Sequence, residues 1–199
     1  MKINFLMKTR NIVLAILLYL LFLNSSFAKN PSDFIQEITD NASKILSSDL
    51  SKNEKQNKLK DIAESAVDIK GIGFYTLGKF RKTLNEDKKK EYSILFKEYF
   101  LKSFSSRLVE YSNPKITVVS EEVLNEKYTM VNSVLAATKD RPEIKIDWRV
   151  YTKNSDNPLI RDLIIEGLSL ARTQKEEFAS IISSNDNNVE ILFKTLKQF

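Results

Sequence analysis

The apolar pattern of residues 159–182 constrains the fold more than any other segment, because its period changes from two to about 3.6 at Glu166 and Gly167. Before the change, one face of an expected strand carries Leu159, Leu163 and Ile165, and the other carries Ile160 and Ile164. After it, helical spacing relates Leu168, Ala171, Phe178, Ala179 and Ile182. A strand with two apolar faces needs cover on both sides. The pattern therefore predicts a strand inside a domain that turns directly into a helix.

The rest of the chain divides into a helical first part and a strand-rich second part. Helical spacing predicts helices beginning near residues 30–33, continuing over 59–66, 74–84 and 87–111, and returning over 168–183 and from 189. Gly71 and Gly73 are interpreted as a bend between helices. Strand patterns cover 116–123, 128–138, 143–152 and 159–166, with short turns between them. This order predicts an α+β fold in which helices wrap a twisted antiparallel sheet of about four strands.

The first 28 residues have the pattern of a secretory signal peptide. Lys2, Lys8 and Arg10 precede an unbroken apolar run over 12–23, and Ser26 and Ala28 are small residues at the −3 and −1 positions of a cleavage site. The run is too short for a transmembrane helix, which needs about 20 residues. We therefore expect cleavage after Ala28, export, and a single domain over 29–199.

The charge of the chain falls when the signal peptide is set aside. The whole chain has 31 Lys and Arg against 26 Asp and Glu, and three of the bases lie in the first 28 residues. The remaining 28 bases nearly balance the 26 acids. Nucleic-acid binding requires a basic surface, so nucleic acid is not an expected partner.

The chain has no histidine and no cysteine. The absence of histidine removes the commonest general base, the commonest metal ligand and every Ser-His or Cys-His nucleophile. Zinc sites built on cysteine are excluded as well. We therefore expect no enzymatic activity, no metal and no cofactor.

Three polar residues are candidates for chemistry. Asp162 and Glu166 lie four residues apart on the expected strand, where a pocket carboxylate could act as a base. The simpler interpretation is that Asp162 and Glu166 are charges at the rim of the sheet, or ion-pair partners of Arg161 or Lys175. Ser169 lacks the G-x-S-x-G context of a nucleophile elbow, so we expect it to cap the following helix.

Aromatic residues are concentrated in the expected helices at 74–84 and 87–111. Six of the chain's 19 Phe and Tyr residues lie between Tyr92 and Tyr111. Such a stripe is normally packed core, but a wall of this kind also suits a ligand cavity.

Three segments together resemble the MlaC family, also called the toluene-tolerance or auxiliary phospholipid-transport family. The first is residues 67–81, with Leu77-Gly78-Lys79-Phe80 at its centre, and the second is 96–108. The third and most specific is residues 162–170, read DLIIEGLSL, followed by Phe178. Two positions depart from the family pattern: Pro158 stands where Trp is usual, and Lys175 where Arg is usual.

The resemblance implies a periplasmic carrier that moves phospholipid between an outer-membrane lipoprotein-porin complex and an inner-membrane ABC-type transporter complex, and so maintains outer-membrane lipid asymmetry. It implies an NTF2-like cone with an apolar cavity between sheet and helices, acting as a monomer. Each CH₂ removed from water is worth ~0.8 kcal/mol, so two acyl chains amount to roughly 20 kcal/mol and need a deep cavity. By position, we expect the lipid to contact Phe74, Leu77, Phe80, Tyr99, Leu108, Val131, Leu135, Trp148, Val150, Leu163 and Ile165.

Two other interpretations remain open at this point. One is an NTF2-like enzyme that uses a pocket carboxylate, for which Asp162 would need a raised pKa inside the cavity. The other is a ligand-free periplasmic structural protein with a filled core.

Overall fold

The computed structural model describes residues 29–199, so the expected signal peptide at 1–28 lies outside the described residues. The helices are α2 (Pro31–Leu46), α3 (Lys52–Ala66), α4 (Ile69–Thr76), the 3₁₀ helix η1 (Gly78–Lys82), α5 (Glu86–Leu108), α6 (Leu170–Ser183) and α7 (Val189–Gln198). The strands are β1 (Ile116–Asn125), β2 (Tyr128–Leu135), β3 (Ile144–Tyr151), β4 (Leu159–Ile165) and β5 (Leu168–Ser169). Within residues 29–199, none of the helices combines the length and hydrophobicity that a membrane crossing requires.

The predicted α+β class is confirmed, and the sheet is antiparallel throughout. Its order β1-β2-β3-β4-β5 follows the chain, because each strand pairs with the next through a short connection. The fifth strand was not predicted. It has two residues, and it forms because Glu166 and Gly167 have φ of 49° and 82°, which suits a two-residue hairpin turn.

Polar side chains fix where most of the helices begin. The Asn30 side chain accepts hydrogen bonds from the Ser32 and Asp33 amides, and Asn85 caps α5 in the same way. The first start was predicted, and α5 begins at Glu86, one residue before the predicted 87. Ser169 caps α6 through the Arg172 amide, as expected, but the helix begins at Leu170 rather than at Leu168.

The predicted helix over 74–84 was wrong in its bounds. Asp68 caps a helix that begins at Ile69, so Gly71 and Gly73 lie inside α4 rather than at a bend. Gly73 is needed there because a Cβ at this position would approach the Phe96 ring to 2.7 Å. The chain turns later, at Gly78, whose φ of +55° favours glycine.

The prediction for the two faces of β4 was also wrong. Leu163 pairs with Trp148, whereas Ile160 pairs with Val150, and the register shift between these pairs leaves Arg161 as an extra residue. Trp148 and Val150 lie on one face because they are two residues apart. The bulge therefore brings Ile160 to the face of Leu163 and Ile165, and Asp162 faces the other way with Arg149.

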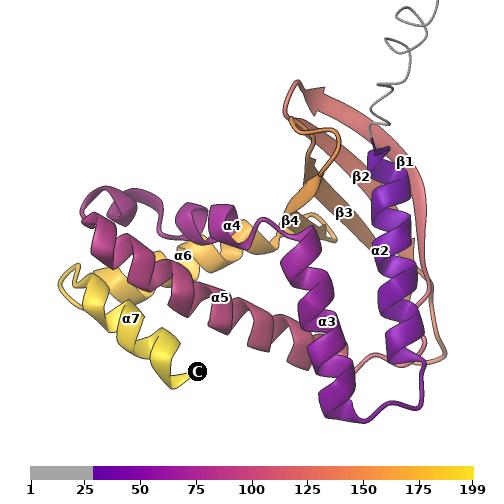
Figure 1. Ribbon diagram of the computed structural model, residues 1–199, viewed down its shortest axis with the longest axis horizontal. Helices are drawn as coiled ribbons and strands as arrows, with labels where there is room; N and C mark the ends of the chain where they lie inside the picture. Colours follow the sequence, from indigo (N-terminus) through magenta and orange to yellow (C-terminus); the bar gives the residue numbers. More distant parts are fainter. Residues whose placement is uncertain (1–28) are drawn as a thin grey trace, which may run out of the picture.

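The helices form two groups around the sheet (Figure 1). Helix α2 lies across the face of β1 and β2, and α3 follows beside it. Helices α4, α5, α6 and α7 extend together beyond the β4 side of the sheet. A parallel bridge between Val67 and Ile160 joins the end of α3 to β4, so the two groups meet there.

Each group has its own buried cluster. The helical cluster joins α4 to α7 and includes Leu77, Phe80, Tyr92, Phe96, Phe178, Ile182, Leu192 and Phe193. The sheet cluster is smaller and consists of Phe34, Ile35, Ala66, Val131, Val150 and Ile160.

Candidate functional site

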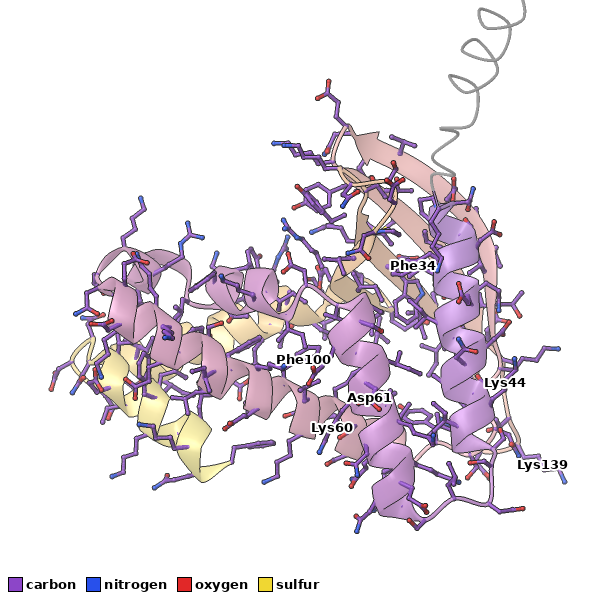
Figure 2. The ribbon with its side chains drawn as sticks, in the orientation of Figure 1. Phe34, Lys44, Lys60, Asp61, Phe100 and Lys139 are labelled. Atoms are coloured by element: carbon purple, nitrogen blue, oxygen red, sulfur yellow. The ribbon has the colours of Figure 1, made fainter. Side chains whose placement is uncertain are left out.

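One face of the sheet is apolar, and its cover is less complete at the end next to β5, although Leu135 and Ile146 on this face are buried. We call it the apolar face; it carries Val131, Trp148, Val150, Ile160, Leu163 and Ile165. Val131 and Val150 are fully buried, because Phe34 and Ile35 of α2 pack against them. Figure 2 shows Phe34 directed from α2 toward the sheet.

The other end of the apolar face still contacts solvent. Trp148, Leu163 and Ile165 are each only half-buried. Leu168, which pairs with Ile165, is 59 % exposed. The Trp148 indole is held in place, since its Nε1 donates to Ser133 Oγ at 2.8 Å. Contiguous cross-strand neighbours therefore present apolar surface that no described helix fully covers.

A pocket of about 240 Å³ opens between α2, α3 and the turn before β4. Its apolar lining includes Phe34, Ile38 and Ala66, which belong to or pack against the sheet cluster, together with Ile62 and Pro158. Its polar lining consists of Lys29, Glu37, Asn41, Ser65, Asp156 and Asn157. This pocket therefore reaches the sheet cluster at Phe34 and Ala66.

The eleven residues expected to contact lipid fall into two places. Leu77 and Phe80 are buried in the helical cluster, and Phe74 and Tyr99 pack against it. On the apolar face, Val131 and Val150 are buried, whereas Trp148, Leu163 and Ile165 are half-buried. Leu135 is buried on the same face, and Leu108 is half-buried at the end of α5. The structure thus brings the sheet residues together but places four of the helical ones in or against a separate core.

The opposite face of the sheet, which we call the polar face, carries Asp162. This side chain is 5 % exposed, and its oxygens accept hydrogen bonds from Ser169 Oγ (2.6 Å) and the Ala171 amide (3.0 Å). The Arg149 guanidinium lies 3.7 Å away. Asp162 therefore joins β4 to the start of α6, and its partners differ from the expected Arg161 and Lys175. Glu166 lies beyond the strand and is exposed.

A second network fixes Arg161. Its Nε and Nη2 each lie 2.6 Å from Asp68 Oδ2, and its Nη1 donates to the Tyr128 hydroxyl at 2.8 Å. The guanidinium also stacks on the Tyr151 ring, 4.0 Å from its centroid. Burial lowers the pKa of Arg161, but the contacts with Tyr128 and Asp68 outweigh it and raise the pKa overall. Asp68 also caps α4, so this network joins the bulge in β4 to the helical group.

A pocket of about 550 Å³ lies between the polar face, α4 and the end of β1. Its lining consists of Gly71, Ile72, Tyr75, Arg81, Leu124, Asn125, Tyr128, Arg149, Arg161, Asp162 and Ala171. None of the eleven expected lipid contacts is among them. The pocket was not predicted, because Arg81, Arg149 and Arg161 lie on three elements and periodicity does not bring them together. Within residues 29–199, no cluster of three or more metal-ligating side chains was found.

Comparison with known proteins gives the family of the chain and a solved structure with a similar fold. The sequence model of the MlaC protein family matches residues 36–198 of the chain. A solved structure of the phospholipid-binding protein from Ralstonia solanacearum, in complex with a phospholipid, superimposes with a TM-score of 0.71. The sequence identity is 17 %, and the match covers 85 % of this chain and 96 % of that one, so the likeness concerns the fold. Because the family match extends over most of the sequence, the chain belongs to the MlaC protein family.

Proposed function

We propose that this protein binds a phospholipid and carries it across the periplasm. The observation that supports this best is the apolar face, where Trp148, Leu163 and Ile165 remain half-buried in a protein of the MlaC family. Adjoining apolar side chains that still contact solvent often mark a ligand or partner site. The Ralstonia protein of the same fold binds a phospholipid, which makes acyl chains the natural occupant.

In this proposal the acyl chains lie against the uncovered end of the apolar face. Covering these side chains with acyl CH₂ groups removes both surfaces from water, at ~0.8 kcal/mol for each CH₂ buried. Of the expected contacts, the three half-buried residues and Leu135 lie on this face, and Leu108 at the end of α5 stays among the proposed contacts. Phe74, Leu77, Phe80 and Tyr99 would then contribute to stability rather than to cargo binding, because they belong to the helical cluster.

The carrier would load and unload at two membrane assemblies. As the family resemblance implies, these are an inner-membrane ABC-type lipid transporter complex and an outer-membrane lipoprotein-porin complex. The periplasmic location follows from the expected signal peptide at residues 1–28. Transport of this kind maintains the lipid asymmetry of the outer membrane.

No catalytic step is included in the proposed function. The enzyme alternative depended on Asp162 as a free carboxylate in the cavity. Asp162 instead lies on the face opposite the apolar one, is ion-paired with Arg149, and holds Ser169 and the Ala171 amide. The ligand-free alternative predicts a protein that is purified without lipid.

The direct test is the lipid content of the mature protein. We expect organic extraction of natively purified protein, followed by mass spectrometry, to yield about one phospholipid per chain. A clean extract from folded protein would contradict the proposal and support the ligand-free alternative.

The location is tested by Leu163→Glu, with Val119→Glu as the matched control. Both residues lie in the sheet, but Val119 is 59 % exposed on the edge strand β1. A carboxylate cannot be buried against acyl chains without a large desolvation cost, so Leu163→Glu should lose most of its lipid and Val119→Glu should retain it. Circular dichroism checks the fold. If Leu163→Glu unfolds, Ile165→Gln provides a milder test of the same surface. Equal lipid content in folded variants would show that the chains lie elsewhere.

A further inference from the structure

The 550 Å³ pocket lies on the polar face, which is the side of the sheet opposite the proposed cargo surface. Six elements contribute to its wall: α4, η1, the end of β1, the start of β2, β3 and β4. The start of α6 completes it through Ala171. It is therefore a separate concavity, and a ligand there would not compete with acyl chains.

The pocket contains more positive than negative charge. Arg161 is neutralised by Asp68, but Arg149 has only the 3.7 Å contact with Asp162. Arg81 forms no hydrogen bond or ion pair among residues 29–199. Elsewhere in this range, Lys52, Lys88 and Lys197 each meet a carboxylate within 3.0 Å. Lys175, which lies 5.1 Å above the Tyr75 ring at the pocket wall, adds a further cation.

Apart from Asp162 and Arg161, the polar groups of the pocket retain hydrogen-bond donors without an acceptor among the described residues. The oxygens of Asp162 already accept from Ser169 and Ala171. The Tyr128 hydroxyl accepts from Arg161, which leaves its own proton free to donate. Asn125 uses its Oδ1 to accept from the Lys127 amide, so its NH₂ group remains. Arg81 and Arg149 supply further N–H groups.

Apolar side chains lie beside these donors. Tyr75 and Leu124 are 45 % and 41 % exposed although they line the pocket, and Ile72 and Ala171 form its buried part. Such a lining fits a ligand that joins an anionic group to an organic group. A phosphate offers more acceptor oxygens than a carboxylate, and guanidinium groups match its geometry in a bidentate manner.

We propose that this pocket is a second binding site, selective for a phosphate ester, in which Arg81 and Arg149 contact the phosphate oxygens. Tyr128 and Asn125 donate further hydrogen bonds, and Tyr75 and Leu124 contact the esterified group. The phosphate belongs either to a soluble ester or to a lipid headgroup at a membrane surface. The proposal does not depend on the identity of the cargo.

The test uses Arg81→Gln, with Arg107→Gln as the control. Arg81 is exposed and has no partner among the described residues, so its replacement should leave the fold intact. Arg107 is an exposed arginine on α5 that does not line the pocket. We expect calorimetric titration with glycerol 3-phosphate to show binding that Arg81→Gln weakens roughly tenfold, equivalent to about 1.4 kcal/mol. Arg107→Gln should bind like the wild type, and the phospholipid recovered by extraction should be unchanged in both.

A second arm distinguishes the source of the phosphate. Flotation with phosphatidylglycerol vesicles measures binding to a lipid headgroup, and inorganic phosphate is then added as a competitor. Loss of flotation in Arg81→Gln without any binding of glycerol 3-phosphate would assign the site to membrane headgroups, whereas the reverse would assign it to soluble esters. The proposal is overturned if wild-type protein binds neither probe, if Arg81→Gln binds both like the wild type, or if acetate and an acidic peptide compete as well as phosphate. Loss of cargo lipid alone would instead count against the proposed function.

Discussion

The helical cluster and the apolar face of the sheet consist of similar residues, but the helical cluster is closely packed and the apolar face is only partly covered. Phe96 is 2 % exposed, and its ring contacts those of Tyr92, Tyr99, Phe100 and Phe178 at centroid distances of 5.8–6.3 Å. Ring pairs at such distances stabilise a core beyond the area they bury. On the apolar face, by contrast, Trp148 packs against the sheet cluster but, like Leu163, remains half-buried.

This difference separates a part that maintains the fold from a part that is available for a ligand. A chain without cysteine has no disulfide to support it, so its stability depends on packing. The helical cluster provides that packing through α4, α5, α6 and α7. The sheet can then leave one end of its apolar face uncovered without loss of the fold.

The largest expected effect compares Phe96→Ala with Leu163→Ala. Phe96→Ala should lower the free energy of unfolding by about 3–5 kcal/mol, because it leaves a cavity among four rings. Leu163→Ala should cost only about 1 kcal/mol, since part of the side chain already contacts solvent. Urea unfolding followed by circular dichroism measures both. Bound lipid per folded molecule should fall in Leu163→Ala and not in Phe96→Ala. Equal losses of stability would mean that the apolar face is part of the core, and the contrast between the two regions would fail.

An intermediate effect is expected where the two regions join. Asp162→Ala removes the acceptor of Ser169 Oγ and the Ala171 amide, and it also removes the carboxylate beside Arg149. Unsatisfied buried donors cost about 1–3 kcal/mol, so the free energy of unfolding should fall by that amount. Lipid binding should persist in the folded fraction, because Asp162 does not lie on the apolar face. If lipid were lost while stability was unchanged, Asp162 would belong to the binding site.

The sequence predicted the fold where local patterns decide it. The helix starts at Asn30 and Asn85, the antiparallel order of the strands and the cap at Ser169 all depend on neighbouring residues. The errors arose where distant contacts decide. The sequence alone indicates a helix break at Gly73. The structure shows that glycine is needed inside the helix there, because the Phe96 ring lies against it. The bulge at Arg161 depends on Asp68 and Tyr128, which lie 93 and 33 residues away and hold its guanidinium.

The candidate site was less predictable than the fold. Periodicity identifies apolar residues such as Phe80 and Leu163 equally, but only the tertiary structure shows that one is buried in the helical cluster and the other half-buried on the sheet. The arginine pocket could not be predicted, since Arg81 and Arg149 are 68 residues apart in the chain and line one pocket only because of the tertiary structure.

The smallest expected effect concerns a polar contact within the helical cluster. Tyr92 is fully buried, and its hydroxyl lies 2.9 Å from Thr76 Oγ1. Tyr92→Phe should therefore cost about 1 kcal/mol at neutral pH through this lost hydrogen bond. Burial also raises the pKa of the Tyr92 phenol well above its usual value.

This raised pKa makes the stability depend on pH. In the unfolded chain a tyrosine ionises near pH 10, whereas in the folded state Tyr92 keeps its phenol proton above that pH, so the free energy of unfolding falls as the pH rises. The same direction applies to Tyr99, whose pKa is raised by burial and by Glu177. Urea midpoints measured from pH 8 to 11 should thus fall less steeply in Tyr92→Phe than in the wild type. Parallel curves would indicate that the phenol is reached by water, and that the helical cluster is less closed than the contrast with the sheet requires.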